Sequence, residues 1–297
     1  MTRYAVGLCD TIHPMTDQLS PRLPPEILSH YGEGVEQPRL VAGTSRLEFA
    51  RTQLILQRFL PRPPARILDV GGGPGAYAHW LTNEGYTVHL VDAVPLHVEQ
   101  ARAAANGYTV ELGDARDLHE PDASADAVLL LGPLYHLTER ADRLRALAEA
   151  GRVLRPGGHV FVAAISRFAS LLDGLREYRL DDPAFVQIVE RDLREGQHRN
   201  PENKPEWFTT AYLHHPDELV REVRDAGLML TDLLAVEGPG WILPDFEARW
   251  REDRRRQELL EAIALIEREP SMLGVSAHLL AVARHLGSMI EEHGLEP

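Results

Sequence analysis

Short apolar runs alternate with helix-forming stretches along the middle of the chain. Five of these runs are apolar nearly throughout rather than on alternate positions, which is typical of strands buried on both faces of a parallel sheet. The stretches between them carry apolar residues at helical spacing. This alternation predicts a right-handed, doubly wound α/β domain. The predicted strands are residues 66–70, 87–92, 109–112, 127–131 and 159–165, with helices over 76–84, over 94–105 and up to 154.

The pattern changes outside this region, and the changes divide the chain. Residues 1–43 are rich in proline and predict a loosely structured arm with a short helix at 25–31. A helix at 44–60 begins the core, which extends to residue 166. Residues 167–215 are polar, with a charged helix pattern and an irregular centre, and an insertion at this point would lie over the strand ends where ligands bind in such sheets. The last part, 216–297, predicts a helix at 217–226, strands at 230–236 and 277–283, and a helical insertion at about 238–275 with a helix over 246–267.

The composition is that of a globular protein. Of 297 residues, 44% are hydrophobic and 26% are charged, and 31 basic against 45 acidic residues give a net charge of −14. A net charge of −14 repels the phosphate backbone of nucleic acids and argues against a nucleic-acid partner. Five arginines between residues 249 and 256 are interrupted by two acidic residues and indicate a solvated helix face.

The single cysteine, Cys9, excludes a disulfide within the chain and a metal site built from cysteines. The first residues lack the apolar run of a signal peptide. No run of about 18 apolar residues occurs, so no membrane span is expected. We therefore expect a cytoplasmic protein that does not interact with a membrane.

A glycine-rich loop follows the first predicted strand and opens a helix. It reads Asp69-Val-Gly-Gly-Gly-Pro-Gly75. Glycine allows a tight turn and the close approach of a ligand to the backbone, and amides at the start of the helix face that ligand. Gly71, Gly73 and Ala76 fit the dinucleotide fingerprint, with Asp92 as the acid that binds the ribose. The same loop fits enzymes that bind S-adenosylmethionine.

Further residues favour the second reading. Asp69 adds a carboxylate that suits a cofactor with an ammonium and a sulfonium. The same negative charge would repel a pyrophosphate. Pro74 removes an amide donor from the loop, which is a small cost to phosphate binding. Gly113-Asp114-Ala115 follows the third strand and places a second carboxylate where an adenine amine could donate to it.

In order and spacing, these motifs resemble those of class I S-adenosylmethionine-dependent methyltransferases. The motifs are residues 67–75, Asp92, residues 113–114 and residues 153–158. The resemblance covers about residues 44–166 well and 207–284 loosely. It implies a Rossmann-like methyltransferase fold with a seven-stranded, mostly parallel sheet whose final strand is antiparallel. It also implies S-adenosylmethionine as cofactor and S-adenosylhomocysteine as product.

The resemblance implies roles for residues near the loop. Asp92 would accept hydrogen bonds from the ribose hydroxyls, Asp114 with Ala115 would meet the adenine, and Asp69 would lie near the methionine amine. Arg51, on the helix before the core, either pairs with the methionine carboxylate or is a surface arginine. The expected cofactor residues are Arg51, Asp69, Gly71, Gly72, Gly73, Gly75, Asp92, Asp114, Ala115 and Leu131.

Tyr135 and His136 follow the fourth strand, where the family brings the cofactor sulfur and the acceptor together. They are the expected catalytic residues. His136 is a candidate base because its unperturbed pKa is near 6.5, although a base is needed only when the nucleophile starts protonated. A purely structural or cofactor-contacting role for His136 stays equally open.

Residues 167–215 supply the expected acceptor contacts. Two arginines there could clamp an acceptor carboxylate, or be surface arginines on a polar lid. Trp207, Phe208 and Tyr212 could either wall an aromatic or hydrophobic acceptor or pack in the core of the lid. No metal is expected, because the adjacent pair at 214 and 215 lacks further ligands at metal spacing. The expected acceptor residues are Arg167, Arg199, Tyr212 and His214.

The predicted function is transfer of a methyl group from S-adenosylmethionine to a small-molecule acceptor by in-line displacement. One alternative is a tRNA (modified uridine) methyltransferase, since residues 269–284 loosely resemble bacterial tRNA carboxymethoxyuridine methyltransferases. Another is a non-catalytic cofactor-binding regulator or an NAD(P)-binding protein. The acceptor, the methylated atom and the oligomeric state stay open.

Overall fold

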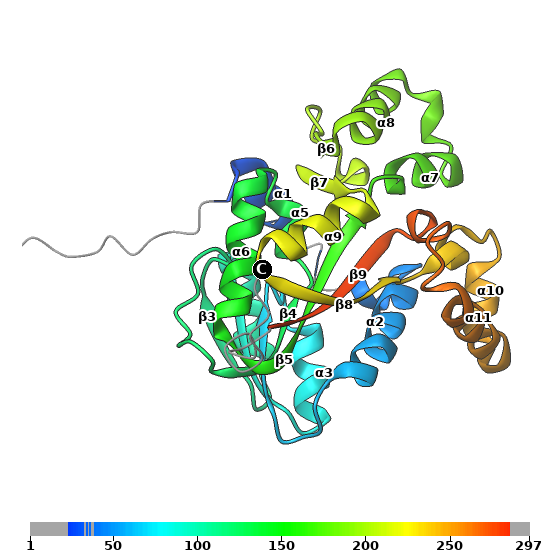
Figure 1. Cartoon of the computed structure of the whole chain (residues 1–297). Coiled ribbons are helices and arrows are strands. Elements are labelled where there is room, and N and C mark those ends of the chain that lie inside the picture. Colours follow the sequence, from blue (N-terminus) through cyan, green and yellow to red (C-terminus); the bar gives the residue numbers. More distant parts are fainter. Residues whose placement is uncertain (1–22, 33, 35, 37–38, 286–297) are drawn as a thin grey trace, which may run out of the picture.

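The computed structural model describes residues 23–32, 34, 36 and 39–285. Its centre is a twisted sheet with helices on both faces, and two groups of helices extend beyond it (Figure 1). Of the predicted arm, the structure describes α1 (Pro25–Gly32), which confirms the helix expected at 25–31, and the short η1 (Arg39–Val41). Cys9 and the other residues up to 22 lie outside the described residues, as do residues 286–297.

Seven strands form the main sheet in the order β3-β2-β1-β4-β5-β9-β8. The first five strands are parallel, and β9 runs antiparallel between β5 and β8. This arrangement confirms the expected seven-stranded, mostly parallel sheet with an antiparallel last strand. The strands are β1 (Arg66–Val70), β2 (Thr87–Asp92), β3 (Thr109–Leu112), β4 (Ala125–Leu130), β5 (Leu154–Ser166), β8 (Leu228–Ala235) and β9 (His278–His285).

Strand β5 has 13 residues and belongs to two parts of the molecule. Most of it pairs with β4 and β9, as a central strand of the main sheet. Its last two residues, Ile165 and Ser166, pair instead with β7 (Ala211–His214). Strand β7 in turn pairs with the short β6 (Gln197–His198). The sheet therefore continues into residues 167–215, where the polar sequence predicted no strands.

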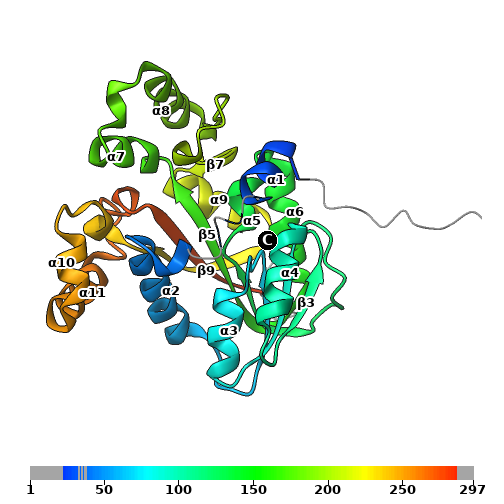
Figure 2. The same ribbon diagram turned by 180° about the vertical axis from the view of Figure 1, so that it is seen from behind.

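The sheet is covered by α2 (Ser45–Phe59), α3 (Ala76–Asn83) and α4 (Pro95–Ala104) on one face (Figure 2). The other face is covered by α6 (Arg140–Val153) and α9 (Pro216–Asp225). Each face buries its own apolar cluster, because the buried strands project side chains alternately to both sides. The strand ends are left uncovered by these layers.

Residues 167–215 form a helical lid above the end of β5 (Figure 1). We call these residues the lid. It contains α7 (Ala169–Arg176), η2 (Arg179–Asp181), α8 (Pro183–Glu195), η3 (Pro205–Trp207) and the β6–β7 pair. Its own apolar cluster includes Phe185, Ile188 and Trp207. The lid is thus a packed unit rather than an irregular loop.

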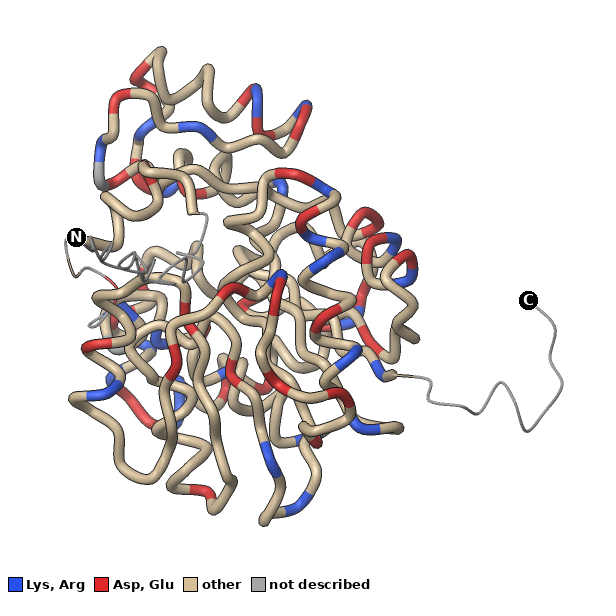
Figure 3. The backbone as a smooth tube through the Cα atoms, turned by 90° about the vertical axis from the view of Figure 1, so that its left-hand side faces the viewer, with Lys and Arg blue, Asp and Glu red and all other residues tan. Residues whose placement is uncertain are grey.

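The second insertion contains η4 (Gly238–Ile242), α10 (Phe246–Arg251), α11 (Asp253–Ile266) and η5 (Leu273–Val275). The single helix expected over 246–267 is divided, because Glu252 between α10 and α11 has an extended backbone, with φ −96° and ψ 115°. Arginines here face acidic neighbours, such as Arg255 with Glu252 at 2.7 Å and Arg256 with Asp253 at 2.7 Å. Over the molecule as a whole, basic and acidic residues are interspersed along the backbone (Figure 3). Within the described part of the chain, no helix combines the length and the apolar character that crossing a bilayer requires.

Candidate functional site

Three cavities meet at the carboxyl ends of the parallel strands, where ligands bind in such sheets. The strand-end cavity is lined by residues that follow β1 to β4 and by α1. The glycine-loop cavity is lined by residues 71–74, α2 and the start of β9. The lid cavity lies between the lid, the start of α2 and Trp241. Glu36 and Tyr135 line all three cavities, so the three spaces adjoin one another.

The glycine loop separates two of these cavities, and its shape depends on glycine. Gly71, Gly73 and Gly75 have positive φ angles of 71°, 57° and 95°. A side chain at Gly72 would bring its Cβ to 2.7 Å from Asp69 Oδ2. The expected cofactor residues Gly71, Gly72 and Gly73 line the cavities, as does Leu131 at the end of β4.

Asp69 lies at the end of β1, fully buried, and lines the glycine-loop cavity. Neither carboxylate oxygen has a hydrogen-bond partner among the described residues. Burial, together with the nearby Asp92, raises the pKa of Asp69 to about 7. A buried acidic group without a partner is costly. Its position therefore suits a cationic ligand group that would complete its hydrogen bonding.

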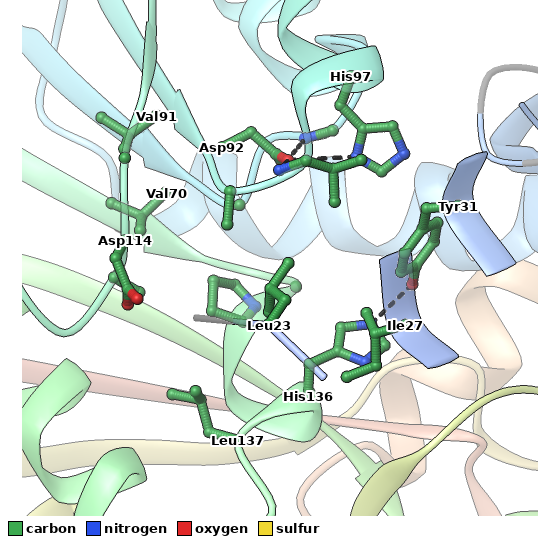
Figure 4. Close-up of a pocket in the computed structure, with 18 of the residues that line it drawn as sticks. Leu23, Ile27, Tyr31, Val70, Val91, Asp92, His97, Asp114, His136 and Leu137 are labelled. Atoms are coloured by element: carbon green, nitrogen blue, oxygen red, sulfur yellow. Dashed lines mark hydrogen bonds and ion pairs between the residues drawn. The ribbon is translucent and has the colours of Figure 1, made fainter. Parts of the chain in front are cut away.

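Asp92 lies at the end of β2 and lines the strand-end cavity (Figure 4). Its Oδ2 accepts from the amide of Gly73 at 2.8 Å, and its Oδ1 accepts from the amide of Val94 at 2.8 Å. His97 Nδ1 lies 3.2 Å from the same Oδ1. Asp92 thus fastens the glycine loop to the start of α4 while its carboxylate borders the cavity.

The rest of the strand-end cavity is mostly apolar. Asp114 and Ala115 follow β3 and line it, and the carboxylate of Asp114 accepts from Arg116 Nε at 2.9 Å. Helix α1 contributes Ile27 and Tyr31 to the same cavity (Figure 4). Part of the predicted arm therefore covers this cavity.

Tyr135 and His136 lie on α5 (Pro133–His136), directly after β4. His136 Nε2 lies 2.7 Å from Tyr31 Oη, its Nδ1 lies 3.4 Å from the carbonyl of Thr210, and burial lowers the pKa of His136 to about 4. Both ring nitrogens thereby have partners, which fits the structural role that the sequence left open, and a base at His136 stays a prediction. Tyr135 faces all three cavities, and burial raises the pKa of its phenol.

Arg51 is not at the site. Arg51 belongs to α2, and its guanidinium is almost fully buried. Its Nε donates to the carbonyl of Val236 at 3.0 Å, and its Nη2 donates to Glu267 at 2.5 Å. The expectation that Arg51 pairs with a cofactor carboxylate is therefore wrong. The arginine that lines the glycine-loop cavity is Arg39, in a segment where the sequence pattern predicted only a loose arm.

The expected acceptor residues do not line the described cavities. Arg167 donates to the carbonyl of Leu213 at 2.9 Å and to Glu218. Arg199 donates to Gln197 Oε1 at 2.6 Å. Arg167 thus ties the base of the lid to α9, and Arg199 stays within the β6–β7 hairpin. Neither side chain lines a described cavity, so the prediction of an acceptor clamp is wrong. Tyr212 stacks on Arg143 at 3.6 Å, and the fully buried His214 lies 3.1 Å from Glu222 Oε2.

The lid cavity has aromatic walls. Trp207 and Phe208, which the sequence suggested for this role, line it together with Trp241 and Phe185. Phe208 has φ 63° and ψ 178°, a backbone conformation that is costly for a residue with a side chain and that tends to occur at functional sites. The cavity has a volume of about 320 Å³. This space is of the size that small ligands occupy.

A charged cluster lies where the glycine-loop cavity meets the lid cavity. The residues common to both cavities are Glu36, Arg39, Tyr135 and His278. Arg39 donates to Glu36 at 2.7 Å and to Glu48 at 2.5 Å. Of these residues the sequence had indicated only Tyr135, because Arg39 on η1, Glu48 on α2 and His278 on β9 lie far apart along the chain.

The described residues fit S-adenosylmethionine, the cofactor that the resemblance implies. The unpartnered Asp69 carboxyl suits its ammonium, and the Asp92 carboxylate at the cavity edge suits its ribose hydroxyls. The apolar lining from Val70, Val91 and Leu137 suits an adenine ring. The glycine loop lets the ligand approach the backbone between these groups.

Comparisons with known proteins agree with this geometry. Residues 68–162 match the family model described as a methyltransferase domain. An uncharacterized methyltransferase of Mycobacterium tuberculosis is 38% identical over 155 residues, which are 52% of this chain and 58% of that protein. A ubiquinone biosynthesis O-methyltransferase of Xanthomonas euvesicatoria pv. vesicatoria is 27% identical, over 70% of this chain and 79% of that protein.

Among solved structures, an S-adenosylmethionine-dependent methyltransferase from Methanosarcina mazei superposes with a TM-score of 0.55 at 19% identity. The superposition covers 78% of this chain and 97% of that one. This likeness shows a shared fold. The chain spans only 58% of the length of the mycobacterial relative.

Proposed function

Since the chain carries a class I S-adenosylmethionine-dependent methyltransferase domain, we propose that it methylates an oxygen atom of a small-molecule acceptor. One observation carries this proposal: Glu36 and Tyr135 line the strand-end cavity, the glycine-loop cavity and the lid cavity alike. A cofactor bound at the loop would thus adjoin an acceptor under the lid. Relatives named as O-methyltransferases support oxygen as the acceptor atom.

The residues around the loop would hold the cofactor. Asp92 would accept from the ribose hydroxyls, Asp69 would accept from the ammonium, and Ala115 would contact the adenine. When bound, S-adenosylmethionine supplies an electrophilic methyl group on a sulfonium. The protein's contribution is position, since fixed geometry alone can supply up to about 7–11 kcal/mol in favourable cases.

The lid would orient the acceptor and keep water from it. The aromatic walls formed by Trp207, Phe208 and Trp241 suit a flat or apolar acceptor. Tyr135, which borders all three cavities, would face both reactants and donate a hydrogen bond rather than take a proton, because the pKa of its phenol is raised.

Methyl-labelled S-adenosylmethionine tests the proposal directly. The protein is incubated with the labelled cofactor and a bacterial extract, after which RNA, protein and metabolite fractions are counted. We expect protein-dependent label in the metabolite fraction. Label confined to RNA would support the tRNA methyltransferase alternative, and cofactor binding without transfer to any fraction would support a regulator.

Replacing Asp92 by alanine should weaken cofactor binding roughly tenfold to a hundredfold, because hydrogen bonds to an ionised acceptor contribute about 1.5–3 kcal/mol. Stability should also fall by about 1 kcal/mol, since the amides of Gly73 and Val94 lose their acceptor. Titration calorimetry measures the affinity. Asp122→Ala, at a side chain that is 79% exposed, is the matched control and should bind normally. Unchanged affinity in the Asp92 variant would contradict the assignment.

Cofactor affinity should rise with pH through the pKa of Asp69. In the free protein this carboxyl is protonated below about pH 7 and ionised above it. A bound ammonium favours the ionised form, so binding below pH 7 must release a proton. Calorimetry should show affinity rising roughly tenfold between about pH 5.5 and about pH 7.5. In Asp69→Asn the affinity should be lower at about pH 7.5 and the rise should disappear; a rise that persists would contradict the role of Asp69.

A further inference from the structure

His278, the first residue of β9, borders both the glycine-loop cavity and the lid cavity. It shares this position with Glu36, Arg39 and Tyr135. In the proposed function, a methyl group that passes from a cofactor at the glycine loop to an acceptor under the lid would pass beside this junction. His278 is therefore placed beside the reacting atoms, although the sequence motifs do not include it.

The imidazole of His278 is held in one orientation by Glu237, which follows β8. His278 Nδ1 lies 2.6 Å from Glu237 Oε1, and the backbone amide of His278 donates to Glu237 Oε2 at 2.9 Å. Ser276 Oγ donates to the same Oε2 at 2.8 Å. The buried Glu237 carboxylate thus has three donors, and the ring nitrogen left for a ligand is Nε2.

The charged groups that face His278 come from three elements. They are Glu48 on α2, Glu237 after β8 and Arg39 on η1, with Glu36 and the phenol of Tyr135 also at the junction. Burial opposes a charge on His278, but Glu48 and Glu237 outweigh it and raise the pKa of His278 to about 9. At neutral pH the ring is an imidazolium, so its Nε2 carries a proton and can only donate.

Among the described residues of the junction, each carboxylate is already ion-paired or hydrogen-bonded, and none is a base strong enough to deprotonate a neutral alcohol. His278 is protonated, both carboxylates nearest the junction are ion-paired with Arg39, and the Tyr135 phenol keeps its proton. A neutral alcohol would need a base here, whereas an acidic acceptor would not. The walls of Trp207, Phe208 and Trp241 favour an aromatic ring.

We propose that His278 donates an Nε2–H hydrogen bond to the reacting oxygen of an aromatic acid, which enters the lid cavity already ionised. This inference rests on the proposed function and names its acceptor class, an aromatic ring with an anionic oxygen. Two cations, Arg39 and His278, face three carboxylates at the junction. The sulfonium adds a third positive charge, so the anion should bind best beside a positively charged cofactor.

The transfer balances without a base. The acceptor loses its proton to solvent before it binds. Its oxygen then forms the new C–O bond while the C–S bond of the cofactor breaks and leaves its electron pair on sulfur. The anion and the sulfonium become two neutral products, and His278 keeps its proton throughout.

The test measures binding rather than turnover. The full chain is saturated with sinefungin, an analogue whose amine provides the positive charge of the sulfonium, and is titrated by calorimetry with 4-methoxybenzoate and with the neutral 4-methoxybenzamide. We expect the carboxylate to bind roughly tenfold to a hundredfold more tightly at neutral pH. His278→Gln, saturated with sinefungin at whatever concentration its own affinity requires, should lose most of this preference.

His285→Gln is the matched control, because His285 ends the same strand and lines none of the three cavities described above. It should keep the preference for the carboxylate. A second readout needs no variant: carboxylate affinity of the unmodified protein should fall as pH rises through about 9, where His278 loses its charge, while amide affinity should not.

Equal binding of the two probes, or a preference that survives in His278→Gln and above about pH 9, would overturn the proposal. Failure of the proposed function is read separately. In that case neither sinefungin nor S-adenosylmethionine binds the unmodified protein, or no methyl group reaches a metabolite fraction.

Discussion

Gly71→Ala is expected to lower the melting temperature by roughly 5–15 °C and to remove measurable binding of S-adenosylmethionine. The backbone of Gly71 has φ 71°, which costs a residue with a Cβ about 1–2 kcal/mol. The added Cβ would also lie 2.4 Å from Cδ of Pro133, and such overpacking costs about 1–3 kcal/mol more. Relief of this contact must move either the glycine loop or α5, and both line the cofactor cavities. Thermal unfolding and calorimetry measure the two effects.

Gly157→Ala separates the two causes. Gly157 has φ 80°, close to the angle of Gly71, but a Cβ there would meet no atom within 4 Å. In Gly157→Ala the free energy of unfolding should fall only by the cost of the positive φ angle, about 1–2 kcal/mol, and the cofactor should bind normally. If the two variants were equally destabilised and both bound cofactor, the contact with Pro133 would have no energetic importance.

Arg143→Met is expected to destabilise the protein by about 3–5 kcal/mol, because it leaves Glu222 buried without its main partner. The Arg143 guanidinium donates to both oxygens of Glu222, at 2.9 and 2.7 Å, and to the carbonyls of Leu137 and Thr138. It also lies 3.6 Å from the ring of Tyr212. One side chain therefore ties α6, α9, the loop after α5 and the lid hairpin together. Chemical denaturation measures the change in the free energy of unfolding.

The loss of stability caused by Arg143→Met should decrease as the pH falls. Burial opposes ionisation of Glu222, but Arg143 and His214 outweigh it and lower the pKa of Glu222 to about 2. In the unmodified protein this stabilisation is complete above the unfolded value of about 4.3 and disappears as pH falls towards 2. The difference between the two proteins should therefore shrink in acid. Arg254→Met is the control, because the exposed pair of Arg254 with Glu258 contributes no more than about 1 kcal/mol. An equally small effect of Arg143→Met would refute the role of the buried pair.

The sequence predicted the elements of the core closely. The bounds of β1, β2 and β3 agree with the predicted strands residue for residue. Buried parallel strands carry an apolar signal that tertiary contacts reinforce, and the glycine loop marks the end of β1 sharply. Asp69 and Asp92 were identified for the same reason, since each is a charged residue at the end of an apolar strand.

The acceptor side was predicted poorly because its residues have no local signature. Arg167 was predicted to bind an acceptor carboxylate, and on the cofactor side Arg51 was a candidate partner of the methionine carboxylate, yet both are buried against acidic partners from distant parts of the chain. His278 sits in an apolar strand, and its partner Glu237 lies 41 residues earlier. Only the pairing of β8 with β9 brings the two together.

The continuity of β5 restricts how the active site can open. Its last residues bond to β7 on one side and to Ala277 on the other, and the amide of Arg167 donates to the carbonyl of His214 at 2.8 Å. A swing of the whole lid about residues 166–167 would break these bonds together. To let an acceptor enter and a product leave, the segment 169–195 would therefore have to move, although it is fixed at both ends. We expect the rate of turnover to change far more with substitutions in α7 and α8 than with substitutions at the base of the lid.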